Sequence, residues 1–161
     1  MIDFLLWLEG SALGHLMRDT GSWTYPVVNL LHIFGIGTLF GSVLIADLRL
    51  LGVWRHVPLA ALTSPASRLA QIGCALALAT GVCLFATTAS DYVGNPFLLI
   101  KFAAIVAALL NAVLLYRATA WRVRNGRALS PHEERQLAVH GGLSLACWIT
   151  AVAAGRMIAY W

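Results

Sequence analysis

The chain has 161 residues, of which 60% are apolar and only 11% are charged, and its mean hydropathy is +0.78. Soluble domains carry about a quarter charged residues, so this composition excludes an ordinary soluble protein. The net charge of +4 does not indicate a nucleic-acid partner, because most basic residues lie in two connections between apolar segments. We therefore expect an integral membrane protein with the lipid bilayer as partner and no nucleic acid.

The first segment, residues 1–22, differs from the rest because its apolar and polar residues alternate with the period of a helix. Its apolar side carries Phe4, Leu5, Leu8, Ala12 and Leu16. A short amphipathic helix of this kind lies in the plane of the membrane interface. We predict such a helix here, followed by a transmembrane domain over residues 23–161.

Four long apolar segments follow, each near the roughly 20 residues that a membrane span needs. We predict spans at about 26–48, 67–90, 96–117 and 136–159. The helices that contain them are expected over residues 26–53, 65–90, 96–124 and 131–159. Three starts carry a capping residue before a proline, at Ser64-Pro65, Asn95-Pro96 and Ser130-Pro131, and Glu133 completes a capping box at the last. The predicted fold is all-α: an integral membrane four-transmembrane-helix bundle preceded by a short amphipathic interfacial helix.

The basic residues predict the orientation of these spans. Eight of the eleven Lys and Arg residues lie in the first and third connections between spans: Arg49, Arg55, Arg68, Arg117, Arg122, Arg124, Arg127 and Arg135. Basic loops stay on the cytoplasmic side of a membrane. The N-terminus and the C-terminus are therefore both expected outside.

Polar residues inside apolar spans require a reason, since burying them in lipid is costly. Asn29 and His32 lie on one side of the first span, and Lys101 is the only lysine of the chain. By helical rise, His32 and Lys101 lie about 9 Å and about 6 Å below the outer ends of their helices. Arg156 lies near the same end of the fourth span. We predict His32, Lys101, Arg156 and Asn29 as cofactor-binding residues, with His32 as the metal ligand.

Plainer interpretations of these residues remain open. His32 is equally well placed to hydrogen-bond a neighbouring helix. Lys101 and Arg156 have side chains long enough to extend to the lipid headgroups.

His140 is not expected to share an iron with His32, because the helical rise separates the two by about 15–18 Å along the membrane normal. We place His140 in an inner polar layer with Asp47, Asn111 and Arg49, or packed beside Ser144.

Two repeats of small residues, Gly37-xxx-Gly41 and Gly73-xxx-Ala77-xxx-Gly81, predict close helix packing. We expect that packing within the bundle, with dimerisation as the alternative.

Three segments together resemble an uncharacterised family of small bacterial inner-membrane proteins. They are Trp23–Gly52, which contains His32, then Asn95–Phe102, and Ala153–Ile158. The resemblance covers nearly the whole chain and implies the bacterial inner (cytoplasmic) membrane, but it implies no activity.

The chain is more distantly similar to the membrane superfamily of CopD-type copper-resistance proteins and HemJ-type protoporphyrinogen oxidases. The matching residues are His32 in an early span and Ile100-Lys101 at the start of a later one. The similarity implies that His32 is an axial ligand of b-type haem and that Lys101 meets a propionate or an acidic substrate. The chain lacks a second histidine at the depth of His32.

Three functions remain open from the sequence. One is a haem b-binding redox or electron-transfer protein that acts on a quinone, a porphyrin or a partner protein. Another is a CopD-like copper or metal-handling membrane protein. A third is a non-catalytic subunit or assembly factor of a membrane complex, with a membrane protein partner or a homo-oligomer, in which the basic segment 117–135 docks a partner or anionic lipid.

Overall fold

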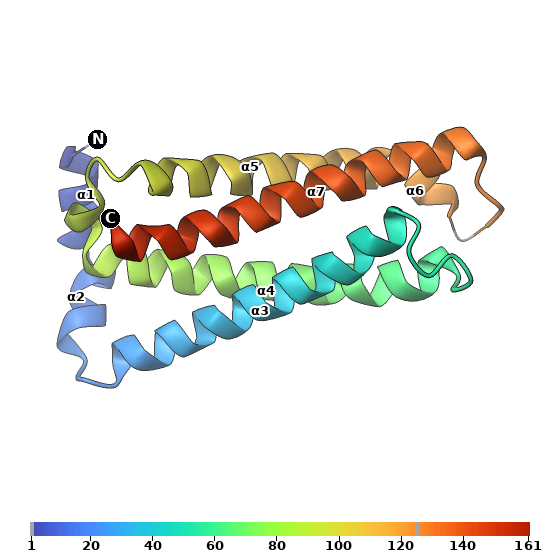
Figure 1. The fold of residues 1–161 in the computed structure, drawn as a ribbon. Helices are drawn as coiled ribbons and strands as arrows, with labels where there is room; N and C mark the ends of the chain where they lie inside the picture. Colours follow the sequence, from blue (N-terminus) through green and yellow to red (C-terminus); the bar gives the residue numbers. More distant parts are fainter. Residues whose placement is uncertain (1, 125) are drawn as a thin grey trace. The chain divides into compact units, whose positions relative to one another are not determined.

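The computed structural model describes residues 2–124 and 126–161, and all regular structure in these ranges is helical. The α-helices are α1 (Ile2–Glu9), α2 (Ala12–Asp19), α3 (Thr24–Leu50), α4 (Leu59–Thr87), α5 (Pro96–Arg117), α6 (Thr119–Val123) and α7 (Pro131–Met157), with short 3-10 helices η1 (Ala89–Tyr92) and η2 (Ile158–Tyr160) (Figure 1). The helices α3, α4, α5 and α7 are long and apolar enough to cross a membrane. The predicted all-α fold with four such helices is confirmed.

The chain forms two compact units, and both α3 and α4 contribute to each. The first unit comprises Met1–Leu39 and Ala70–Asn95. The second comprises Phe40–Leu69 and Pro96–Trp161. Each unit is described by itself below.

In the first unit, α3 and α4 approach so closely that their backbones touch. A Cβ atom added at Gly73 would lie 2.5 Å from the backbone nitrogen of Leu39, and one added at Gly35 would lie 2.7 Å from that of Ala77. Small residues permit this contact, so the predicted packing role of Gly73 and Ala77 is confirmed. The same expectation for Gly37 and Gly41 is wrong, because added Cβ atoms there would meet no described atom within 4 Å.

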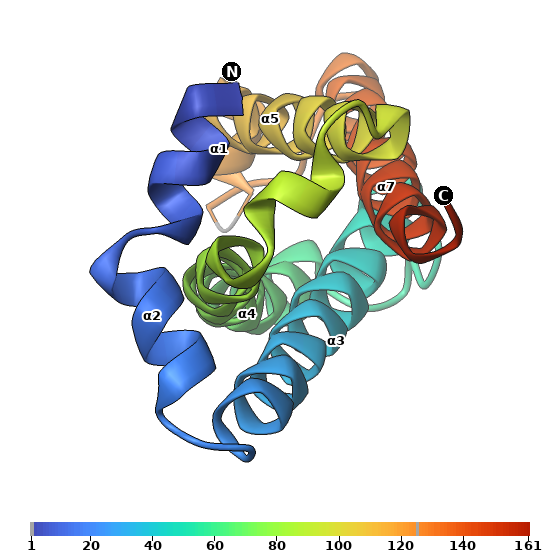
Figure 2. The ribbon, with the colours of Figure 1, turned by 90° about the vertical axis from the view of Figure 1, so that its left-hand side faces the viewer.

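The N-terminal segment forms two short helices where we expected one. The break falls at Gly10 and Ser11, and the Ser11 hydroxyl accepts a hydrogen bond from the backbone of Gly14 as the cap of α2. Glycine disfavours a helix interior and serine favours a cap, which accounts for the break. Gly14 also lets α2 lie close to the end of α4, since an added Cβ would be 2.9 Å from the carbonyl of Ala86 (Figure 2).

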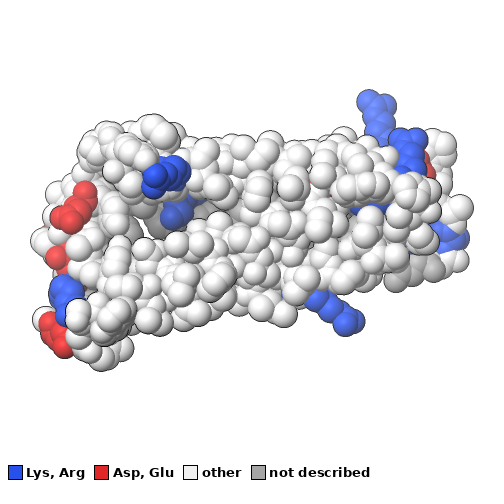
Figure 3. All heavy atoms as spheres, turned by 60° about the horizontal axis from the view of Figure 1, so that its bottom comes forward, with Lys and Arg blue, Asp and Glu red and all other residues white. Residues whose placement is uncertain are grey.

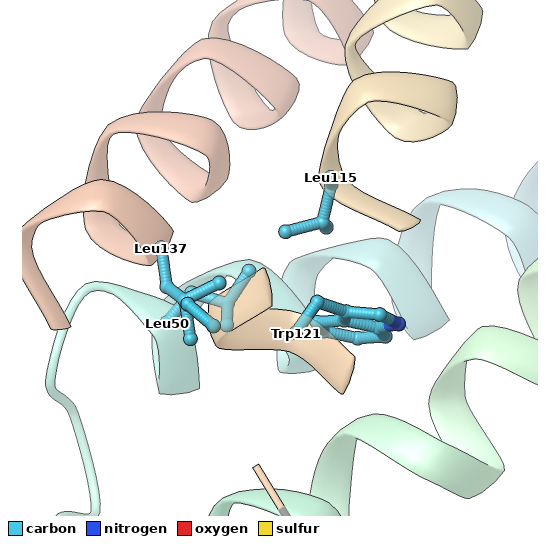
Figure 4. Packing of buried hydrophobic residues seen from close by; sticks show 5 residues of the cluster. Leu50, Leu115, Trp121 and Leu137 are labelled. Carbon is cyan, nitrogen blue, oxygen red and sulfur yellow. The ribbon is translucent and has the colours of Figure 1, made fainter. Parts of the chain in front are cut away.

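In the second unit, α5 and α7 run side by side (Figures 1 and 2). Four alanines are buried on these two helices: Ala104, Ala108, Ala151 and Ala154. Near one end of the pair is a buried cluster formed by Leu50, Leu115, Ala120, Trp121 and Leu137 (Figure 4). This cluster explains why the predicted helix over 96–124 is interrupted. The backbone is extended at Ala118, and the separate α6 carries Trp121 into the cluster.

The helix starts were predicted with mixed success. α5 begins at Pro96 and α7 at Pro131, and Ser130 and Glu133 form the predicted capping box. The predicted start at Pro65 is wrong, since α4 begins at Leu59 and contains that proline. The hydroxyls of Thr63 and Ser67 donate to carbonyls one turn earlier, at 3.0 and 2.6 Å, and so add bonds around a residue that has no N–H.

Charged side chains gather at the helix ends and in the connections. The helix surfaces between these places carry very few of them in the space-filling view (Figure 3). The exposed side chains there are mostly large and apolar, as on Ile33, Phe34, Val106 and Leu110. Such surfaces fit contact with lipid.

Candidate functional site

His32 lies half-buried on α3, and its ring bonds a hydroxyl on α4. The distance from His32 Nδ1 to Thr80 Oγ1 is 2.9 Å. The Thr80 hydroxyl donates its proton to the carbonyl of Leu76 at 2.6 Å. Because a hydroxyl has one proton, we assign the neutral ring the tautomer in which Nδ1 carries the hydrogen and Nε2 the lone pair.

Gly81 shapes the place that the imidazole occupies. A Cβ atom added at Gly81 would lie 3.0 Å from Cε1 of His32 and 3.6 Å from Nδ1. The glycine therefore makes room for the ring as well as for helix packing. Sequence reasoning singled out Gly81 for packing alone and missed Thr80. The signal that was available is a threonine-glycine pair in an otherwise apolar span.

The other predicted residue of the first unit, Asn29, lies half-buried on α3 one turn before His32. Lys101 and Arg156 belong to the second unit. The cofactor-binding roles of these four residues stay predictions.

Lys101 is half-buried, and its alkyl chain runs along the α5–α7 contact. A Cβ added at Gly155 would lie 3.7 Å from Lys101 Cδ and Cε and 3.8 Å from Nζ. Within residues 2–124 and 126–161, the ammonium group makes no hydrogen bond or ion pair. A lysine that is half-buried without a counter-charge is the most unusual cation of the spanning helices.

Arg156 follows Gly155 and is exposed. Its guanidinium donates to the hydroxyl of Tyr160 and lies 4.8 Å from the centre of that ring. The structure therefore places the Lys101 side chain against Gly155, the residue that precedes Arg156 on α7.

A polar layer lies farther along the second unit. The side chain of Asn111, which is 3% exposed, contacts His140 twice. Its amide donates to the carbonyl of His140 at 2.9 Å, and its oxygen lies 2.7 Å from Nδ1 of the ring. The expected association of His140 with Asn111 is confirmed.

Asp47 and Arg49 are the other predicted members of the inner layer, and their surroundings differ. Asp47 is 4% exposed, and its Oδ2 is buried without a hydrogen-bond partner among the described residues. Arg49 lies outside the layer, because its Nε donates to the carbonyl of Val57 in the connection that follows α3.

The side chains that could ligate a metal can be compared with the ligands that a metal ion or a haem requires. No group of three or more His, Cys, Asp and Glu side chains that suits a metal ion occurs among the described residues. A haem needs less from the protein, since one proximal histidine holds the iron in many haem proteins. A ligating histidine usually donates its other ring N–H to a neighbouring hydrogen-bond acceptor. His32, which donates Nδ1–H to Thr80, fits that role.

Four helices of this length and apolarity suggest a multi-pass membrane protein of the all-α class. The chain belongs to a family of unknown function, DUF6644, which matches it over residues 4–161. No curated protein and no solved structure matches the chain. The expected membership in an uncharacterised family is confirmed, while the relationship to CopD-type and HemJ-type proteins stays a prediction.

Proposed function

We propose that this chain is a haem b-binding redox protein of the bacterial inner membrane, with His32 as an axial ligand of the iron. The observation that carries the proposal is the 2.9 Å hydrogen bond between His32 Nδ1 and the hydroxyl of Thr80, which orients the ring beside Gly81. In the proposed orientation, the arginine-rich connections are cytoplasmic and both termini are outside. Electrons would pass to or from a quinone, a porphyrin or a partner protein.

A bound haem would supply a reversible one-electron change, and the residues of the chain would set the conditions for it. Thr80 holds the His32 ring in one tautomer and one rotation, and its hydrogen bond makes Nε2 a stronger donor. Gly81 leaves space for the ring edge. For Lys101 and Arg156 we propose a cationic pair that binds a carboxylate, from a propionate or from an acidic substrate.

The test is a reduced-minus-oxidised visible spectrum of the full chain purified from haem-replete cells, with a pyridine haemochrome assay. Wild type is expected to show a b-type signal, and His32→Ala should lose it. His140→Ala is the matched control, because it removes a half-buried histidine that Asn111 already holds at its ring. A colourless wild type, or a His32→Ala variant with the wild-type spectrum, would contradict the proposal.

A second variant, Thr80→Val, tests the hydrogen bond itself. It should retain haem but raise the midpoint potential, because a less basic imidazole stabilises the oxidised iron less. The potential is measured by redox titration of the Soret band. An unchanged midpoint potential in Thr80→Val would show that Thr80 does not influence the iron. The His32–Thr80 bond would then be purely structural.

A further inference from the structure

The second unit contains a cavity of about 590 Å³ that the proposed redox function does not use. Its charged lining consists of Arg49, Arg55, Arg124, Arg127, Arg135 and Glu134. The residues come from the last turn of α3 and the connection after it, from the connection between α6 and α7, and from the first turns of α7. A volume of this size lies within the range of small-ligand sites in proteins, about 300–1,000 Å³.

The positive charge of this cavity is mostly uncompensated. Of the lining arginines, Arg127 alone has a carboxylate partner among the residues that the structure describes, in two bonds of 2.9 and 2.7 Å to Glu133. Glu133 thereby raises the pKa of Arg127 above its usual value. Arg49 donates to backbone carbonyls, and the side chains of Arg55 and Arg135 make no hydrogen bond or ion pair within the described part of the chain.

Arg124 is held in place by Trp121 and retains unused donor capacity. Its guanidinium lies 3.8 Å from the centre of the Trp121 ring and also donates to the backbone carbonyl of that residue. Its Nε is buried and has no hydrogen-bond partner among the described residues. Burial lowers the pKa of Arg124.

The cavity also has an apolar part. Leu50 and Leu137 line it and belong to the buried cluster of the second unit (Figure 4). Leu50 ends α3 and Pro131 begins α7, and both helices are apolar enough to span a membrane. The ends of spanning helices lie at the level of the lipid headgroups. The lining therefore suits a ligand with a charged group and an attached apolar chain.

We propose that this cavity binds a phosphate-bearing anion, and that the anion is the headgroup of an anionic phospholipid. Guanidinium groups bind phosphate oxygens in pairs, which lysine does not do as well. Setting membrane topology requires basic residues in a loop, but it does not require them to converge on a cavity. The convergence of several arginines without acidic partners is what the lipid site explains.

The test is native mass spectrometry of the full chain in detergent, with phosphatidylglycerol, phosphatidylcholine and inorganic pyrophosphate as probes. Phosphatidylglycerol should be retained in preference to phosphatidylcholine. The double variant Arg55→Gln/Arg135→Gln should weaken its binding about 30-fold, at about 1 kcal/mol for each arginine. The pair Arg117→Gln/Arg122→Gln is the control, because it removes the same amount of positive charge from arginines that do not line the cavity.

Further measurements distinguish a lipid headgroup from a soluble phosphate compound, and they test whether the arginines bind the anion with paired donors. Binding of pyrophosphate in place of lipid, with the same dependence on Arg55 and Arg135, would support the phosphate site and assign it to a soluble compound. Arg124→Lys keeps the charge but loses the paired donors, so it should also weaken binding. Equal losses in the control pair, or equal retention of both lipids without pyrophosphate binding, would overturn the proposal. His32→Ala should leave lipid binding unchanged, which separates this site from the proposed haem site.

Discussion

The contact between α3 and α4 and the contact between α5 and α7 are made by different kinds of residue. In the first unit, α3 and α4 meet backbone to backbone at Gly35 and Gly73. In the second, α5 and α7 meet through buried alanines and through the bonds between Asn111 and His140. The first contact depends on the absence of side chains, and the second depends on a specific polar pair. Both solutions are known in membranes, where apolar contact alone provides little driving force.

The histidines at these two contacts also differ in the groups that their rings contact. His140 is held at its ring and at its carbonyl by one asparagine, which is the pattern of a structural residue. His32 bonds a threonine hydroxyl that fixes its tautomer, and its ring lies against a glycine. The two histidines therefore differ in the residues that hold their rings.

The largest effect is expected from filling the glycine contact. Gly73→Ala places a Cβ 2.5 Å from the backbone of Leu39, so the helices must move apart. Overpacking of this kind costs about 1–3 kcal/mol. The measurement is the free energy of unfolding in detergent or bicelles.

The matched control for this change is Gly37→Ala, where an added Cβ meets no described atom within 4 Å. It should leave the stability unchanged or raise it by about 0.5–1 kcal/mol, because alanine favours a helix over glycine. Equal losses in the two variants would show that the contact between α3 and α4 is not set by Gly73.

A smaller effect is expected from the polar pair of the second unit. Asn111→Ala leaves Nδ1 of His140 without its partner. Interhelical hydrogen bonds in membranes are worth about 0.6–2 kcal/mol. A double-mutant cycle of Asn111→Ala with His140→Ala should give a coupling free energy in that range. Additive losses would mean that the two residues stabilise the protein independently, and that the contact between α5 and α7 does not depend on this polar pair.

The smallest effect concerns the end of the first unit, where Oε2 of Glu9 accepts bonds from the hydroxyl and the backbone N–H of Ser90 at 2.7 and 2.9 Å. These bonds lower the pKa of Glu9. A carboxyl whose pKa is lowered by folding stabilises the fold above its unfolded pKa, about 4.3, and loses that contribution as the pH falls through the lower folded value.

Wild type should therefore melt above Glu9→Gln at pH 7, and the difference should shrink as the pH is lowered from 7 toward 3. Thermal melting of both proteins across this pH range measures it. A difference that stays constant from pH 7 to pH 3 would show that the charge of Glu9 has no part in it.

Local signals predicted some helix boundaries well and others poorly. The starts at Pro96 and Pro131 were predictable, because a cap and a proline act within one turn. Pro65 carries the same local signal, yet α4 begins earlier, where Thr63 is fully buried and bonds the carbonyl of Leu59. The break at Ala118 has no local signal, since it follows from the burial of Trp121 in a cluster with residues distant in sequence.

The sequence by itself determined the class of the protein. Four apolar segments, their lengths and the few charges within them follow from composition and spacing alone, because the cost of polar groups in lipid acts on each segment separately. Candidate residues could also be named, since His32 and Lys101 are conspicuous in apolar spans. Only the tertiary structure decided their partners. Thr80 beside His32, Asn111 beside His140 and the converging arginines of the cavity are contacts between distant segments, and the chain encodes such contacts only through its packing.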